Sequence, residues 1–308
     1  MLAQVLDADP WKFQWHPEVW LLVAFLTAAY IYTVRVIGPQ AVGPGRPAVS
    51  RANVIAFVAA MGMLWVASDW PLHDISEEYL YSAHMLQHMM LSFFLPPLAL
   101  MATPTWLARV IVGDGRVYRA VSWLAKPVVA GVMFNLVAIV THIPLMVNES
   151  VDNGPLHYSL HLLVVVSALL MWTPVVGPFP ELRIGPLGTC VYLFLMSVVP
   201  TIPAAWLTFA EGSVYSAYDI PYRLWGISVT DDQQLAGAIM KTGGGIFLWT
   251  IIVAIFFRRF AANYSSEHNY RRGARLPTAE ISGHDDFPLT TEDVEREFSQ
   301  TAPAPGDD

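Results

Sequence analysis

The sequence contains a single cysteine, Cys190, among 308 residues. One thiol cannot form an intramolecular disulfide, a redox-active cysteine pair or a four-cysteine zinc or iron–sulfur site. Charged residues are scarce as well, at 14% of the chain, whereas a typical soluble domain has about 25%. Because 55% of the residues are hydrophobic, the composition excludes an ordinary soluble domain and indicates an integral membrane protein.

An excess of basic charge is also absent. The net charge is −8, and ten of the 25 acidic residues lie from Glu267 onward, so the acidity describes a solvated C-terminal tail rather than a surface for a partner. No nucleic-acid partner is expected. The N-terminus lacks the basic start and small-residue cleavage site of a signal peptide, so the first apolar run is expected to remain as a spanning helix.

Long apolar runs are what the chain has instead. A membrane-spanning helix needs about 20 mostly apolar residues, and seven runs reach this length: 18–37, 51–70, 79–101, 127–147, 156–176, 186–208 and 234–257. The sequence therefore predicts an all-α fold, a polytopic membrane protein whose seven transmembrane helices form one domain, residues 1–260. Residues 261–308 are polar and are predicted to form a disordered cytoplasmic tail.

Charge alternates between successive loops. Arginine and lysine gather around 38–50, in 102–126 and after 257, whereas acidic residues gather in 69–78, 148–154 and 211–232. Loops rich in Lys and Arg stay on the cytoplasmic side of a membrane. The pattern predicts an N-terminus outside and a C-terminus inside.

Histidines gather toward the outer side under this topology. A helix rises 1.5 Å per residue, so the five histidines within the spans lie roughly 3–10 Å below the outer interface. Ionisable side chains inside a bilayer are costly, and several of them at one depth indicate a functional site. The seven histidines on this side are His16, His73, His84, His88, His142, His157 and His161.

Four of these histidines form two pairs with a spacing of four residues, one pair in 84–88 and one in 157–161. Residues at this spacing share a helix face, so each pair can bind one metal ion. Methionines border the first pair, and imidazole with thioether favours copper, Cu(I) in particular. No ligating carboxylate is expected at this depth, which disfavours magnesium, calcium and di-iron sites. The predicted metal ligands are His84, His88, His142, His157 and His161, with Met85 and Met89 secondary.

A structural interpretation competes with the metal at each position. A single histidine often hydrogen-bonds a neighbouring helix, and methionine often fills gaps between helices. The acidic segment after Asp69 is expected to be a solvated loop. Asp69 and His73 are expected to lie at the entrance to the site. Asp231 or Asp232 is expected to cap the last spanning helix, and Asp232 and Gln233 are expected to lie near the site without binding the metal directly.

Two segments resemble a known family. HMLQHMMLSFFLPPLALMATP (84–104) and DDQQLAGAIM (231–240) are similar to the two signature stretches of the CtaG-type cytochrome c oxidase assembly factors, and the resemblance covers about 18–260. It implies a protein of the bacterial plasma membrane whose partners are oxidase subunits and an extracytoplasmic copper donor. Lys241 departs from the aromatic residue expected after Ile-Met. The residues that match the motifs are His84, Met85, His88, Asp232, Gln233 and Gln234.

The combined hypothesis is an assembly factor that binds copper at an outward-facing intramembrane site and delivers it to an oxidase subunit. No catalysis is expected, because the sequence has no nucleophile–base arrangement, nucleotide-binding loop or redox cysteine pair. Two alternatives remain open. Histidines on facing helices also suit a bis-His haem cytochrome. A copper transporter would need polar groups toward the inner face, where the spans are mostly apolar.

Overall fold

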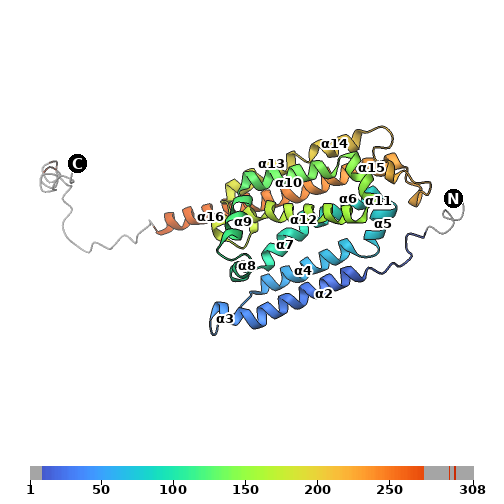
Figure 1. Ribbon diagram of the computed structural model, residues 1–308. Helices are drawn as coiled ribbons and strands as arrows, with labels where there is room; N and C mark the ends of the chain where they lie inside the picture. Colours follow the sequence, from blue (N-terminus) through green and yellow to red (C-terminus); the bar gives the residue numbers. More distant parts are fainter. Residues whose placement is uncertain (1–8, 274–290, 292–294, 296–308) are drawn as a thin grey trace. The chain divides into compact units, whose positions relative to one another are not determined.

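The computed structural model describes residues 9–273, 291 and 295, and every regular element in these residues is helical. The long helices of residues 9–259 run roughly along a common direction (Figure 1). The α-helices are α2 (Pro17–Tyr32), α3 (Gly38–Val42), α4 (Arg51–Ser68), α5 (Leu72–Glu78), α6 (Tyr81–Met89), α7 (Leu95–Ala102), α8 (Thr105–Val112), α9 (Arg116–Leu124), α10 (Pro127–Thr141), α11 (Pro144–Asp152), α12 (Gly154–Val176), α13 (Pro186–Val198), α14 (Thr201–Phe209), α15 (Val229–Ala238) and α16 (Gly244–Gly273). Single π-helical turns, η1 (Thr33–Ile37), η2 (Met90–Phe94) and η6 (Ile239–Gly243), connect helices within three spans, and η3 (Pro180–Leu182), η4 (Ser216–Tyr218) and η5 (Leu224–Gly226) are short 3-10 turns.

Six helical segments in the described residues are long and apolar enough to cross a membrane. A seventh is obtained if α9 and α10, which are bent by 73° at their junction, count as one span. The prediction of an all-helical, multi-pass membrane protein is therefore confirmed, with six or seven spans. The six are Pro17–Val42, Arg51–Glu78, Tyr81–Ala102, Gly154–Val176, Pro186–Phe209 and Val229–Ala261.

The span predicted at 127–147 is not continuous. Helix α10 ends at Thr141, and α11 begins at Pro144. Proline has no N–H for the helical ladder and pushes the residue before it toward extended backbone, and Ile143 has φ −68° and ψ 130°. His142 lies at this break, as the residue that follows the last turn of α10.

The span Tyr81–Ala102 adjusts to two adjacent prolines. Pro96 and Pro97 lie in the first turn of α7, directly after the π turn η2. Pro96 cannot donate to the carbonyl of Ser92, and the indole Nε1 of Trp172 donates to that oxygen instead, at 3.1 Å. The indole thereby satisfies a buried acceptor and ties α12 to the span that carries His84 and His88.

A buried apolar cluster fills the bundle on the far side of η2 from the histidines. It includes Phe93, Phe134 and Trp172, contributed by η2, α10 and α12. Large apolar side chains also face outward, for example Phe25, Val128 and Leu162. Such an exposed apolar surface suits a protein surrounded by lipid.

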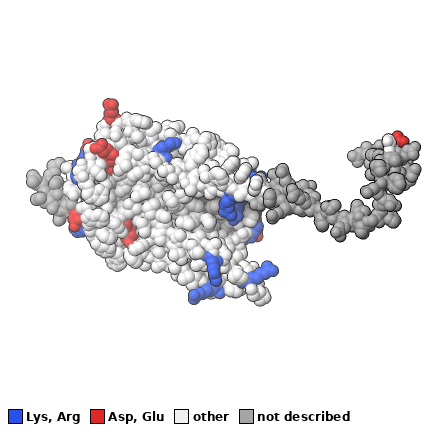
Figure 2. Space-filling model, turned by 180° about the vertical axis from the view of Figure 1, so that it is seen from behind, with Lys and Arg blue, Asp and Glu red and all other residues white. Residues whose placement is uncertain are grey.

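Residues Met1–Arg259 and Phe260–Asp308 form two compact units. Within the first unit, Figure 2 shows acidic side chains gathered at the end that holds α5 and α11, and most of the visible basic side chains toward the end that holds α3 and α8. The predicted tail, 261–308, lies mostly outside the described residues, and α16 itself continues to Gly273.

Candidate metal site

Four histidines from two helices come together in the structure. Helix α6 contributes His84 and His88, and α12 contributes His157 and His161. Ring centroids lie 4.5 Å apart for the pair on α6, 4.3 Å apart for the pair on α12, and 4.7 Å apart between His88 and His161. One ring nitrogen each of His84, His88 and His161 lies within 4.8 Å of the others. We call these four residues the histidine cluster.

A carboxylate joins the histidine cluster, contrary to the sequence-based expectation. Glu77 Oε1 lies 3.3 Å from His84 Nδ1 and 3.1 Å from His157 Nε2. Glu77 was expected in a solvated loop, but residues 72–78 form the helix α5, which turns this side chain inward so that it is only 21% exposed. A signal was available: His73 and Glu77 are four residues apart, the spacing of one helix face.

Ligand atoms in this group are buried without hydrogen bonds. His88 Nε2 and His161 Nε2 have no hydrogen-bond partner among the described residues, and the close contacts of Glu77 with His84 and His157 lack hydrogen-bond geometry. An unpaired buried polar atom costs about 1–3 kcal/mol. Several such atoms pointing at one region fit a metal ion, since imidazole and carboxylate together bind zinc, iron or copper.

Asp232 supports the cluster from a distance rather than capping its own helix. Its carboxylate accepts hydrogen bonds from the backbone N–H groups of Tyr81 at 2.7 Å and Ser82 at 3.0 Å, at the start of α6. The predicted cap of the last span was wrong: Ser228 caps α15 by accepting from the backbone N–H of Asp231 at 3.1 Å. A carboxylate at a helix start satisfies free N–H groups and the helix dipole, so Asp232 fixes where α6 begins.

Gln87 holds the other face of α6. Its side-chain nitrogen donates to the Ala67 carbonyl at 2.7 Å and lies 3.3 Å from His73 Nδ1, and its oxygen accepts from Ser76 at 3.1 Å. These contacts join α6 to the end of α4 and to α5. His73 therefore contacts α6, the helix that carries His84 and His88, through Gln87. Asp69 is buried at the end of α4 and belongs to neither group of candidate ligands.

Gln233 stabilises the loop between α14 and α15. Its oxygen accepts from the backbone N–H of Val214 at 2.7 Å, and its nitrogen donates to the Tyr215 carbonyl at 3.3 Å. Tyr215 in turn donates through its hydroxyl to the carbonyl of His142 at 2.9 Å. Burial raises the pKa of Tyr215 to about 12, so this hydroxyl keeps its proton for the hydrogen bond.

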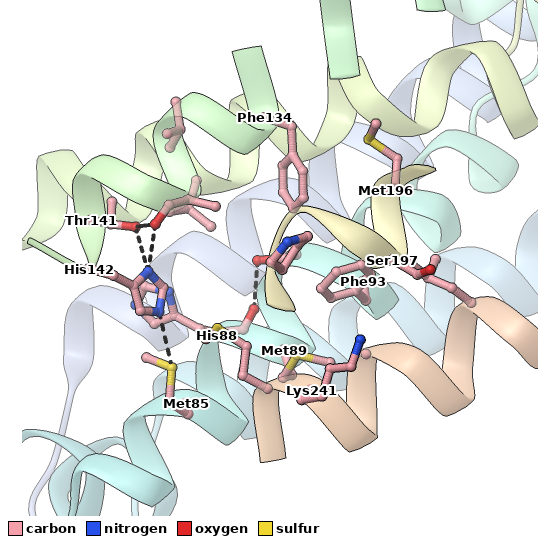
Figure 3. A pocket seen from close by; sticks show the side chains of 18 of the residues that line it. Met85, His88, Met89, Phe93, Phe134, Thr141, His142, Met196, Ser197 and Lys241 are labelled. Carbon is pink, nitrogen blue, oxygen red and sulfur yellow. Dashed lines mark hydrogen bonds between the residues drawn. The ribbon is translucent and has the colours of Figure 1, made fainter. Parts of the chain in front are cut away.

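His142 lies apart from the histidine cluster. It belongs to neither group of candidate ligands, and its Nε2 faces the Met85 sulfur at 3.4 Å (Figure 3). Together with His88 and Met89, these side chains line a cavity of about 60 Å³ that adjoins the histidine cluster at His88. Lys241 lines the same cavity and donates to Thr201 Oγ1 at 2.5 Å rather than to an acid. The predicted ligands therefore divide into two sets.

Comparison with known proteins places the chain in a family. Residues 28–262 match the family described as Cytochrome c oxidase caa3 assembly factor, which covers both histidine-bearing helices and the Asp232 segment. No curated protein and no solved structure matches the chain. The resemblance inferred from the two signature segments is thus confirmed, and an assembly-factor family indicates a non-catalytic role with oxidase subunits as partners. The chain belongs to the cytochrome c oxidase caa3 assembly factor family.

Proposed function

We propose that this assembly factor binds copper, as Cu(I), at the histidine cluster and delivers it to a cytochrome c oxidase subunit. The observation that carries the proposal is the convergence of His84, His88 and His161 from two helices, with ring nitrogens within 4.8 Å of one another. His88 Nε2 and His161 Nε2 are buried without hydrogen bonds among the described residues. Glu77 and His157 complete the donor set as further ligands or as orienting groups.

Copper is argued from the family as much as from the donors. The lack of a carboxylate no longer disfavours magnesium, calcium or iron, because Glu77 does lie at this depth. Imidazole accepts zinc, iron, nickel or copper. Among these, copper is the ion that a haem–copper oxidase must acquire, so a compact site of buried imidazoles in an oxidase assembly factor is best explained by copper as cargo.

Haem fits the cluster less well than a single ion. Two axial imidazoles with metal–nitrogen bonds of about 2 Å would hold their ring centroids roughly 6 Å apart. Three of the four ring pairs between α6 and α12 lie only 4.7, 5.4 and 5.7 Å apart. The remaining two imidazoles of the cluster also crowd the space in which a porphyrin would extend.

Delivery at the same face is favoured over transport through the bundle. Below the cluster along α6 and α12, the packed side chains Phe93, Phe134 and Trp172 are 1–6% exposed and offer no ligand for an ion, although the thioethers of Met89, Met171 and Met196 belong to the same apolar cluster. The acidic end of the first unit is the end nearer the cluster, and basic loops are retained in the cytoplasm. We therefore assign the cluster to the outer side of a bacterial plasma membrane, where an extracytoplasmic copper donor can reach it.

The full chain purified in detergent tests the proposal. Wild-type protein titrated anaerobically with Cu(I) against a coloured competitor should bind copper without visible absorbance, since Cu(I) has a filled d shell. The variant His88→Ala/His161→Ala should lose the copper held by the cluster, and His268→Ala, far along the chain, should not. Stoichiometric haem in the purified protein, with no Cu(I) binding, would overturn the proposal in favour of the cytochrome alternative.

A further inference from the structure

The contact between His142 and Met85 is separate from the histidine cluster. Successive residues turn about 100° around a helix, so Met85 is rotated away from His84 and points toward α10 rather than α12. There its sulfur meets His142, which ends α10. Figure 3 shows the imidazole directly above the Met85 side chain, with Met196 and Lys241 farther along the cavity.

Hydrogen bonding fixes which nitrogen of His142 carries the proton. Nδ1 lies 2.6 Å from the carbonyl oxygen of Ala138, and a carbonyl oxygen only accepts. Nδ1 is therefore the N–H donor, and Nε2 of the neutral ring keeps its lone pair. A histidine that donates one ring N–H to a backbone carbonyl has the arrangement seen in metal-ligating histidines.

Two electron-pair donors then face each other. Nε2 of the neutral ring has no hydrogen, and a thioether sulfur has none, so the 3.4 Å contact, drawn as a dashed line in Figure 3, is a hydrogen bond only when the ring is protonated at Nε2. A cation bound by both would satisfy both. With metal–nitrogen and metal–sulfur bonds of about 2.0 and 2.3 Å, a separation of 3.4 Å gives a nitrogen–metal–sulfur angle of about 105°, close to tetrahedral.

Further soft donors lie close by. Met240, in η6, packs with Met85 in one apolar cluster, and Met89 and Met196 line the same cavity. Sulfur ligands select Cu(I) over harder ions such as magnesium or calcium. The lining is therefore richer in thioether than the histidine cluster, where the neighbouring carboxylate makes a harder environment.

We propose that His142 and Met85 form a second Cu(I) site, completed by a thioether from the same cavity. The identity of the metal rests on the proposed function, but the site itself rests on the His142–Met85 geometry. His88 belongs to the histidine cluster and also lines this cavity. An ion held by the cluster can therefore move to the softer site by exchanging ligands around one shared imidazole, without crossing the apolar core.

Copper stoichiometry and copper-edge X-ray absorption of the full chain test this site, with Cu(I) as the probe. Wild-type protein should bind two equivalents, and its spectrum should include a sulfur scatterer near about 2.3 Å. Met85→Leu should bind one equivalent and lose the sulfur scatterer. The matched control is Met171→Leu, an equally buried methionine outside the cavity, which should retain both.

Each outcome bears on a different claim. A wild-type protein that binds one equivalent with nitrogen scatterers alone would overturn the second site and leave the proposed function intact. Two equivalents with unchanged sulfur scattering in Met85→Leu would also overturn it. Absence of any Cu(I) binding would overturn both claims. A wild-type spectrum without a sulfur scatterer overturns the second site whether or not Met85→Leu folds.

Discussion

The position of α6 depends on one carboxylate from a distant span, and this dependence gives a quantitative prediction. Asp232 is 3% exposed and accepts from the N–H groups of Tyr81 and Ser82. Asp232→Ala leaves both donors buried and unpaired. At about 1–3 kcal/mol for each, the free energy of unfolding should fall by roughly 2–6 kcal/mol, and Asp232→Asn, which keeps one strong acceptor, should lose about half as much.

Thermal unfolding of the detergent-solubilised protein measures this loss. Domains of 150–250 residues lose about 2–4 °C in midpoint per kcal/mol, so a clear decrease is expected for Asp232→Ala. Cu(I) affinity should also fall by about 10–100-fold, the usual effect of disturbing groups that orient ligands, because His84 lies one turn from Tyr81. Asp231→Ala is the control, since this side chain is exposed and its hydrogen bond within the described residues is with Ser228. Equal midpoints and affinities for the two variants would refute the reasoning.

Three further predictions follow from the site and the charge distribution. The variant His84→Ala/His88→Ala should abolish oxidase activity in cells while the protein stays in the membrane, because two ligands are lost; normal activity would contradict the ligand assignment. Glu77→Gln should weaken Cu(I) binding about tenfold in the competitor titration, and a wild-type affinity would show that this carboxylate neither touches nor orients the ion. A reporter fused after Arg275 should be cytoplasmic and one within 148–154 extracytoplasmic, whereas the reverse would place the cluster on the wrong side for an external copper donor.

The depth of each histidine in the membrane was predictable from the sequence, whereas the neighbouring helix that its side chain faces was not. Run length and the fixed rise per residue placed the paired histidines of α6 and α12 at one level, and the structure brings them together. The same arithmetic placed His142 at that level too. It faces Met85 instead, because the choice of neighbour depends on how α10 packs against α6, and a helical period carries no such information.

Hydrogen-bond partners that are distant in the sequence could not be predicted either. Asp232 was assigned to the helix that follows it, since local capping rules see only nearby residues. Its actual partners lie about 150 positions earlier in the chain. Glu77 was misassigned for a different reason: an acidic segment bounded by proline resembles a loop, and only packing against Gln87 and Tyr218 shows that residues 72–78 are a helix held against the cluster.

The hydrogen bonds between Asp232 and α6 constrain the amino acids at their two ends differently. The carboxylate recognises main-chain N–H groups, so the side chains at 81 and 82 play no part in that recognition. Proline at residue 82 would remove this bond, because it has no backbone N–H, whereas a small side chain that fits the buried position of Ser82 keeps the donor. Residue 232, in contrast, must present two oxygens at a fixed reach. One partner in the contact is constrained by its chemistry, and the other only by its backbone.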